Sequence, residues 1–377
     1  MKNGHVKYWM ALKSIPGIGN AASLALFDKF GSLESVFSAS ATDLAATPGI
    51  SKKTAGAIAG YKGWETIKRS LEAIDKANIS VVTVEDKLYP ENLINVYDRP
   101  AVLYVRGKLQ KGDITVAIVG SRIATTHGKY TTERISRELT QRGITIVSGM
   151  ARGIDSAAHR GALAARGRTV AVLGCGLDVI YPPENEKLFS NIIENGAVIS
   201  EFPPGTPPLA SNFPSRNRII SGMSYGVVVV EASEKSGSLI TARLALEQGR
   251  EVFAVPGSVE AATSRGTNKL IKQGAKLIEN ADDVLEEILP QLEKTTLLKN
   301  FQADDEQKPH ADIKENLNDA EAQLFSLITD NQIHVDDLIL AAGLSPAETL
   351  GSLMSLELKG LITQHPGKLF SQKQAGK

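Results

Sequence analysis

The sequence predicts an α/β protein with a doubly wound parallel sheet at its centre and a small helical unit on either side. Short apolar runs alternate with helical patterns between residues 114 and 278. Most of these runs are apolar at nearly every position, which indicates strands covered by helices on both faces. The chain has 377 residues, too many for one small core, and this favours two to three domains.

The central segment supplies the elements of the predicted sheet. We expect strands at 114–119, 144–147, 169–173, 197–199, 227–230, 252–255 and 276–278, after two shorter runs at 79–84 and 102–105. Helical patterns occupy 129–142, 155–165, 184–195, 216–224, 239–248 and 269–273. A helix between successive strands makes each connection a crossover between parallel strands. Residues 79–289 are therefore predicted to form an extended Rossmann-like domain.

Residues 1–78 read as short helices around two similar turns. Residues 14–19, Ser-Ile-Pro-Gly-Ile-Gly, precede a helical stretch at 21–30, and a looser copy at 47–51 precedes 54–60. This layout is typical of a helix-hairpin-helix (SAM-like) domain, in which backbone N–H groups at a helix N-terminus can face a phosphate. A helical bundle that uses these segments only as turns is the alternative.

The C-terminal part begins with a polar, aperiodic segment. Residues 290–317 are predicted to form a flexible linker. Residues 318–377 then show helical patterns at 320–329, 335–341 and 346–359, followed by two short apolar runs around Pro366-Gly367. Three helices and a hairpin outline a winged helix.

The net charge is zero, but the charges are unevenly distributed. Lys and Arg outnumber Asp and Glu by 15 to 11 in residues 1–116 and by 19 to 14 in residues 117–280, whereas residues 281–377 carry 8 against 17. The charges therefore favour binding of a polyanion to the first two segments and oppose its binding to the third. One cysteine, no signal-peptide pattern and no long apolar run together predict a cytoplasmic protein without a membrane span.

The loops after the predicted strands carry the candidate binding residues. In doubly wound sheets ligands bind at the carboxyl ends of the strands, and these loops are rich in Gly, Ser, Asn, Arg and Lys. Glycine allows backbone N–H groups to approach an anion, Arg matches phosphate geometry, and an aromatic ring can stack on a base. The candidates for single-stranded DNA binding are Ser121, Arg122, Phe213, Arg216, Asn217, Lys235, Ser236, Gly237, Ser238, Asn268 and Lys269.

Structural roles are open for several of these residues. The glycines could serve only as turns, and Phe213 could belong to the core. Arg216 and Arg218 lie two positions apart on a helix and do not share a face, so one of them could be structural.

Enzyme motifs are missing from the sequence. The first strand is not followed by Gly-x-Gly-x-x-Gly, and no GxxxxGK[ST] loop is present. Cys175 and His159 stand in no nucleophile–base motif, and the six histidines are scattered. We therefore expect no catalytic residue, no metal and no cofactor.

Four segments, in this order along the chain, resemble the bacterial DNA-processing (DprA/Smf) family. They are residues 117–122 (AIVGSR), 147–159 (VSGMARGIDSAAH), 213–220 (FPSRNRII) and 236–242 (SGSLITA). The resemblance extends from the first hairpin to the winged helix. It implies a core that binds and protects single-stranded DNA and helps to load the recombinase RecA during natural transformation, in competent cells and in DNA recombination.

The resemblance also implies which residues act. Arg122, Phe213 and Lys235 match the DNA-contacting positions of the family, and the other candidates lie on adjacent loops. A homodimer is implied, with its contact in the segment 270–277, where Ile271 and Leu277 are apolar. No catalytic activity is implied.

Two rival functions remain at this stage. The first is a nucleotide-processing enzyme of the phosphoribohydrolase type on a related fold, for which Glu231 and Glu247 are the available carboxylates. The second is a scaffold in which the sheet loops are purely structural. The winged helix has its own expectation: its helix at 346–359 carries Glu348, Glu357 and only Lys359, so we expect a protein-interaction or regulatory module.

Overall fold

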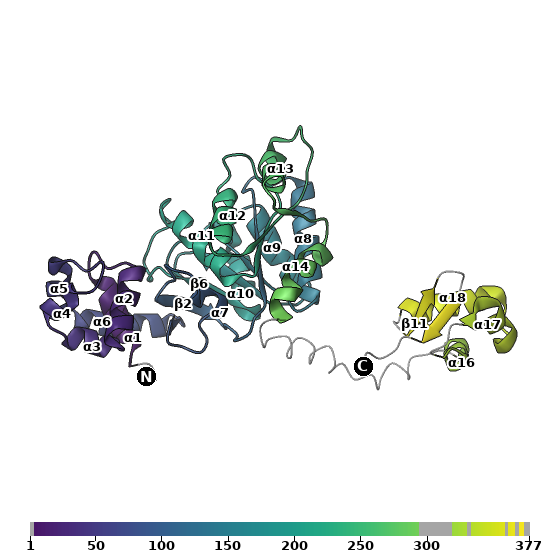
Figure 1. Cartoon of the computed structure of the whole chain (residues 1–377), viewed down its shortest axis with the longest axis horizontal. Coiled ribbons are helices and arrows are strands. Elements are labelled where there is room, and N and C mark those ends of the chain that lie inside the picture. The colour runs from purple at the N-terminus through teal and green to yellow at the C-terminus, as the bar shows by residue number, and fades with distance from the viewer. Residues whose placement is uncertain (1–3, 294–318, 330–332, 359–360, 366–368, 373–377) are drawn as a thin grey trace. The chain divides into compact units, whose positions relative to one another are not determined.

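A computed structural model describes residues 4–293, 319–329, 333–358, 361–365 and 369–372 (Figure 1). The chain divides into two compact units, Met1–Leu297 and Leu298–Lys377. Most of the segment predicted to be a linker, residues 294–317, lies outside the described residues. Its first residues are helical, because the helix α14 (Ala281–Glu293) continues through Pro290. None of the described helices is both long and apolar enough to cross a bilayer.

The N-terminal helices contain both predicted turns. The six helices are α1 (Val6–Ser14), α2 (Asn20–Phe30), α3 (Leu33–Ser38), α4 (Ala41–Ala45), α5 (Lys52–Ala59) and α6 (Trp64–Lys76). Gly17, between α1 and α2, has a φ of 88°, and Gly49, between α4 and α5, has a φ of 82°. Both turns need this left-handed backbone, which glycine adopts at little cost. The two Pro-Gly segments therefore fold alike.

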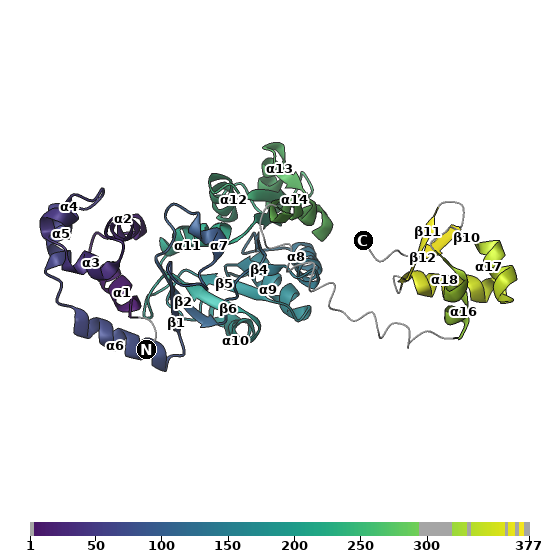
Figure 2. The same cartoon turned by 60° about the horizontal axis from the view of Figure 1, so that its bottom comes forward.

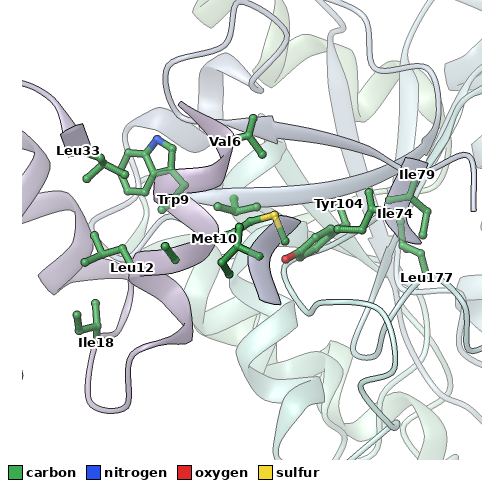
Figure 3. Close-up of a cluster of buried hydrophobic side chains, with 14 of the residues drawn as sticks. Val6, Trp9, Met10, Leu12, Ile18, Leu33, Ile74, Ile79, Tyr104 and Leu177 are labelled. Atoms are coloured by element: carbon green, nitrogen blue, oxygen red, sulfur yellow. The ribbon is translucent and has the colours of Figure 1, made fainter. Parts of the chain in front are cut away.

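The N-terminal helices share one hydrophobic core with the sheet. Trp9 of α1 is fully buried, and its indole N–H donates to the Glu85 carboxylate at 2.6 Å. Met10, also in α1, belongs to the same buried cluster as Tyr104 and Leu177 of the sheet domain, and the labelled side chains can be followed in Figure 3. The first unit is thus held together by apolar contacts across the first 80 residues and the sheet.

The sheet has nine strands in the order β1-β2-β6-β5-β4-β3-β7-β8-β9. The strands are β1 (Ser80–Thr83), β2 (Val102–Gly107), β3 (Thr115–Val119), β4 (Thr145–Ser148), β5 (Thr169–Leu173), β6 (Ala197–Ser200), β7 (Gly226–Val229), β8 (Glu251–Ala254) and β9 (Lys276–Leu277). Every pair from β6 to β9 is parallel, as predicted. The two earliest strands extend the sheet in antiparallel fashion, β1 on β2 and β2 on β6.

Helices cover both faces of the sheet (Figures 1 and 2). The helices α8 (Thr126–Gln141), α9 (Ile154–Ala164) and α10 (Glu186–Asn195) pack on one face, and α11 (Asn212–Met223) and α12 (Ser238–Glu247) on the other. Alternate residues of β5 show this division, because Ala171 and Leu173 join the cluster of α10 whereas Val170 and Val172 join that of α11. Three further elements complete the layers: α7 (Glu91–Ile94), a 3₁₀ turn at Pro183–Asn185 and α13 (Arg265–Lys272).

The second unit is a small domain with its own core. It contains α16 (Asp319–Leu327), α17 (Val335–Ala342) and α18 (Pro346–Leu358), and a sheet in the order β10-β12-β11. The strands are β10 (Ile333–His334), β11 (Ile362–His365) and β12 (Leu369–Gln372). The three helices and the hairpin confirm the winged-helix prediction, and β10 is a strand that the sequence pattern did not reveal. Leu324, Leu338, Leu353 and Phe370 form the centre of its core.

Candidate nucleic-acid interface

The strand order places one crevice at the centre of the carboxyl edge of the sheet. The chain runs outward from β3 through β4, β5 and β6, and then returns to β7 on the other side of β3. Ligands of doubly wound sheets bind at this reversal point. The loop after β3 carries Ser121 and Arg122, and the loop after β7 carries Lys235 and Ser236. The fold therefore brings two of the predicted basic loops together.

Phe213 lies beside Arg122 at this edge. It belongs to the first turn of α11, which begins at Asn212, four residues earlier than predicted. The Arg122 guanidinium lies over the Phe213 ring at 5.3 Å, and the Tyr181 ring lies 5.7 Å away on another side. Gly174 permits this packing, since a Cβ there would be only 3.0 Å from the Phe213 ring. Phe213 is thus partly exposed and does not belong to the core.

A cleft of about 250 Å³ adjoins this pair of residues. Its lining combines Arg122 and Arg152 with the apolar side chains of Ile123, Tyr181 and Phe213. Ile123 is 88% exposed and Tyr181 38% exposed. Arg152 is paired with Glu184, so Arg122 is the cation of this lining that has no ion pair among the described residues. Large apolar groups that remain exposed beside such a cation suit a ligand with both flat and charged parts. Tyr181 was not predicted from sequence, because it carries no charge and stands in no glycine-rich loop. Ile123 directly follows Arg122 in the predicted loop and was not singled out because it is apolar.

Arg216 was predicted to contact DNA, and the structure corrects this. Its side chain is buried, with only 4% of the residue exposed. Its guanidinium donates to the carbonyl of Gly149 at 2.7 Å and to that of Val172. Burial lowers the pKa of Arg216 to about 10 and raises the pKa of the neighbouring Asp155, whose carboxylate accepts from Ala151 N–H. Arg216 therefore ties the loop after β4 to the strand β5 from within.

Asn217 stands beside Arg216 and is half-buried. Its side-chain oxygen accepts from the Arg216 Nε at 3.2 Å. Asn217 thus orients the buried guanidinium, and its position at the rim of the crevice follows from this contact.

The loop after β7 presents Lys235 to solvent. Lys235 is exposed and, among the described residues, makes no hydrogen bond or ion pair. Ser236 and Ser238 bond to each other at 2.8 Å at the start of α12, and the exposed Gly237 lies between them. Ser238 is buried, so only Lys235, Ser236 and Gly237 of the four predicted residues offer groups to a ligand directly.

The remaining candidates divide in the same way. Asn268 is tied to the loop after β8, because its side chain both donates to and accepts from the backbone of Gly257, at 2.9 and 3.2 Å. It therefore shapes a loop and has little left for a ligand. Lys269 is exposed on α13. Ser121 accepts from the N–H of Ile123 and donates to its carbonyl, which holds the loop of Arg122 in a tight turn.

The first N-terminal turn is occupied by a group of the sheet domain. The Asn20 side chain, at the start of α2, donates to Glu201 at 3.2 Å, and Lys13 bonds Asn20 at 2.7 Å. Glu201 pairs with the buried Arg218, which also pairs with Asp98 at 3.1 Å. Arg218 is therefore the second structural arginine of α11. A cleft of about 680 Å³ is lined by residues of this network and by Pro48 and Gly49 of the second turn.

Three groups considered for catalysis have structural surroundings. His159 is fully buried, hydrogen-bonded to Thr169 at 2.6 Å, and burial lowers its pKa to about 3. Burial raises the pKa of the Cys175 thiol to about 11. Glu231 accepts from the N–H and hydroxyl of Thr125 at 3.0 and 2.6 Å, at the start of α8. Both Cys175 and His159 are therefore buried packing residues.

Three family models match successive parts of the chain. DNA recombination-mediator protein A matches residues 80–289, the SAM-like helix-hairpin-helix tandem matches 10–59, and the DprA winged helix domain matches 308–368. The first of these covers more than half of the chain. This chain belongs to the DNA recombination-mediator protein A (DprA/Smf) family.

Relatives and solved structures agree with the family assignment. Protein Smf of Synechocystis is 34% identical over 99% of this chain and its own full length, and Protein Smf of Escherichia coli is 40% identical over 82% of each chain. The structure of DNA processing protein A from Streptococcus pneumoniae, 36% identical, covers 75% of this chain and 98% of its own with a TM-score of 0.63. That from Helicobacter pylori, 33% identical, covers 56% and 97% with a TM-score of 0.51.

The family assignment and the fold together confirm two predictions. The architecture is the predicted one: a Rossmann-like sheet domain between an N-terminal helix-hairpin-helix domain and a C-terminal winged helix. The DprA/Smf resemblance inferred from the four sequence segments is correct. The chain is thus a DNA-processing, recombination-mediator protein by family, and two of its exposed cations, Arg122 and Lys235, lie at the reversal point of the sheet.

Proposed function

We propose that this protein binds single-stranded DNA at the carboxyl edge of its sheet. The observation that carries the proposal is the Arg122–Phe213 pair at the reversal point, where a free guanidinium lies over a partly exposed ring. A base can stack on the ring while the guanidinium and Lys235 meet neighbouring phosphates. The Helicobacter pylori relative, whose structure concerns its single-stranded DNA binding mode, supports the same ligand here.

The interface favours binding without sequence preference. The carbonyls of Gly149 and Val172 belong to buried residues and accept hydrogen bonds from Arg216, so neither is offered to a base. Stacking and phosphate contacts do not distinguish bases strongly. We therefore expect the protein to hold any single strand, as protection of incoming DNA requires.

We propose a binding role without catalysis. The phosphoribohydrolase alternative needs a carboxylate free to act on a nucleotide, and Glu231 is committed to the cap of α8. Glu247 lies at the opposite end of α12 from the crevice, since α12 begins at Ser238 and ends at Glu247. Neither carboxylate favours that reaction, and the phosphoribohydrolase function is retained only as an outcome of the nucleotide turnover assay.

We further propose that the bound strand is handed to a RecA recombinase in natural transformation, in the cytoplasm. The family description as a recombination mediator supports this step. The test is RecA-dependent ATP hydrolysis on single strands coated with a single-strand-binding protein. Stimulation by this protein, and its loss in Arg122→Ala, is expected; equal ATP hydrolysis with and without the protein contradicts the role.

We propose a homodimer through the β9 edge of the sheet. β9 is the last strand of the sheet, and Leu277 on it is 44% exposed. Ile271 of α13, in the same segment, is half-buried. Leu277 therefore offers most of the exposed apolar surface of residues 270–277. Sedimentation of wild type and Leu277→Arg tests this. We expect the wild type to be a dimer and the variant to be a monomer. If the wild type is already a monomer, the proposal is overturned.

The winged helix has a different proposed role, in protein interaction or regulation. At the start of α18, Glu348 accepts from the Ser345 hydroxyl at 2.8 Å, so a carboxylate lies where a groove-binding helix usually carries cations. Leu340 of α17 is 81% exposed. Because this unit has its own core, residues 318–377 can be tested alone, and salt-dependent micromolar binding to DNA would overturn the proposal.

The central test is a titration of labelled oligo-dT at two salt concentrations. Wild type is compared with Arg122→Ala, Lys235→Ala and the control Lys111→Ala, which removes one exposed cation before β3, at the opposite edge. Each interface variant should weaken binding about tenfold and reduce the slope of log affinity against log salt concentration by about 0.7. If neither variant weakens binding, the proposed interface is wrong. Turnover of a nucleoside monophosphate in a parallel assay would favour the enzyme.

A further inference from the structure

The loop after β8 lies directly against the loop that carries Lys235. β8 pairs with β7 in parallel, so both loops leave the same edge of the sheet. Two backbone hydrogen bonds join them: Ala232 N–H donates to Thr263 at 2.8 Å, and Gly266 N–H donates to Ala232 at 2.7 Å. The residues that open α13 are therefore fixed beside the start of the Lys235 loop.

Gly266 makes this approach possible. A Cβ at this position would lie 2.6 Å from the carbonyl oxygen of Ala232 and 2.8 Å from that of Ser233. Both are backbone atoms that cannot easily move away. The close contact therefore requires glycine, and it fixes the neighbouring Arg265 at the edge.

Arg265 is the first residue of α13 and is exposed. Among the described residues its side chain makes no hydrogen bond or ion pair, and the same is true of Lys235 and Lys269. Its position at a helix N-terminus adds the partial positive charge of the helix dipole. The two loops also carry the exposed Glu234 and Glu260, so the local field is only weakly positive. A ligand must therefore contact the cations directly.

We propose that Arg265 is a further phosphate-binding residue, and that the bound single strand continues from Phe213 past Lys235 to the start of α13. This inference rests on the function proposed above. Phe213 packs on Gly174 after β5, and Arg265 lies beside the end of β7, so the path crosses the ends of β4, β3 and β7. At roughly 4.8 Å between neighbouring strands it is about 15 Å long. Figures 1 and 2 show α11, α12 and α13 following one another along this side.

The path predicts a dependence on DNA length. A short strand can occupy the Arg122–Phe213 pair without reaching α13, whereas a longer strand can reach both. Loss of Arg265 should therefore matter only for the longer strand. Loss of Arg122 should matter for both.

The experiment measures the affinity of the full chain for oligo-dT of about 2 and about 15 nucleotides. The first is too short for the path from Phe213 to Arg265, and the second is near the upper end of known site sizes. The variants are Arg265→Ala, Arg265→Lys and Arg122→Ala. The control is Lys111→Ala, which removes an exposed cation before β3, at the opposite edge of the sheet. Thermal unfolding of each variant checks that the fold is retained.

We expect Arg265→Ala to weaken the longer oligonucleotide threefold to tenfold (on the order of one phosphate contact) and to reduce its salt slope by about 0.7. Arg265→Lys should restore most of the affinity and most of the salt slope, and Lys111→Ala should change neither. The inference is overturned if Arg265→Ala leaves the longer strand unaffected, or weakens both lengths equally, while Arg122→Ala weakens both. If Arg122→Ala also has no effect, the proposed function itself fails.

Discussion

The arginines of α11 and the cations of the neighbouring loops have opposite surroundings. Arg216 and Arg218 are buried and bound to carbonyls or carboxylates. Arg122 and Lys235 are exposed, and their charges are not neutralised by any ion pair in the described part of the chain. In sequence all four stand in or beside segments rich in Ser, Asn and Gly. Their environment, and not their identity, separates residues that build the candidate interface from residues whose charges are free for a ligand.

The comparison predicts its largest effect for Arg216→Ala. Removing this guanidinium takes away the stronger of the two positive charges that act on Asp155, and it deprives the carbonyls of Gly149 and Val172 of this donor. The free energy of unfolding should fall by about 3–5 kcal/mol. Urea unfolding measures it. Arg122→Ala is the matched exposed control and should change the stability by less than about 0.5 kcal/mol.

The next effect concerns binding through Phe213. Phe213→Ala removes the stacking face, and the affinity for oligo-dT should fall by about 1–3 kcal/mol. Since the ring is partly exposed, the stability should change much less than for a buried phenylalanine. Fluorescence anisotropy and urea unfolding are measured together. Large loss of stability with unchanged affinity would make Phe213 a core residue instead.

His159 is a buried residue that should make the stability of the folded protein depend on pH. Its pKa is about 3 in the folded protein against an ordinary value of 6.5. Between these values the unfolded chain binds a proton that the folded chain does not, so stability falls as the pH falls. The slope attributable to this residue is about 1.4 kcal/mol for each pH unit. His159→Gln should remove it in urea unfolding at pH 6 and 5, and an unchanged slope contradicts the assignment.

The smallest effect sharpens the role of Arg122. Arg122→Lys keeps the charge and loses the planar group over Phe213, which is worth about 0.5–1 kcal/mol at an exposed site. Binding should weaken about threefold with an unchanged salt slope. In the Phe213→Ala background the same substitution should have no effect, because the ring is already absent. If the losses of affinity are additive in this double-mutant cycle, Arg122 and Phe213 act independently and the prediction is wrong.

The elements of the sheet domain were predictable because each strand is a short apolar run with a helical pattern behind it. Alternation of this kind fixes a parallel sheet with helices on both faces. The order of the strands was not predictable, since nothing local states that β7 returns beside β3. The antiparallel pairing of β1 and β2 depends on the same long-range contacts.

The interface was predictable by loop but not by side chain. Each sequence segment marked a loop at the correct edge, whereas burial decided which residues face solvent. Arg216 and Asn268 satisfy backbone groups of neighbouring loops, and those loops become neighbours only after folding. Tyr181 reaches the crevice for the same reason and has no local signal.

The most direct test of the interface is photo-crosslinking of the full chain to oligo-dT that contains 4-thiothymidine, with the linked peptides identified by mass spectrometry. Linked peptides should contain Phe213 or Tyr181, and Phe213→Ala should reduce the yield. Peptides from the helices before residue 78 and from residues 318–377 should remain unlinked. Links confined to those two regions, with none at the carboxyl edge of the sheet, would contradict the account.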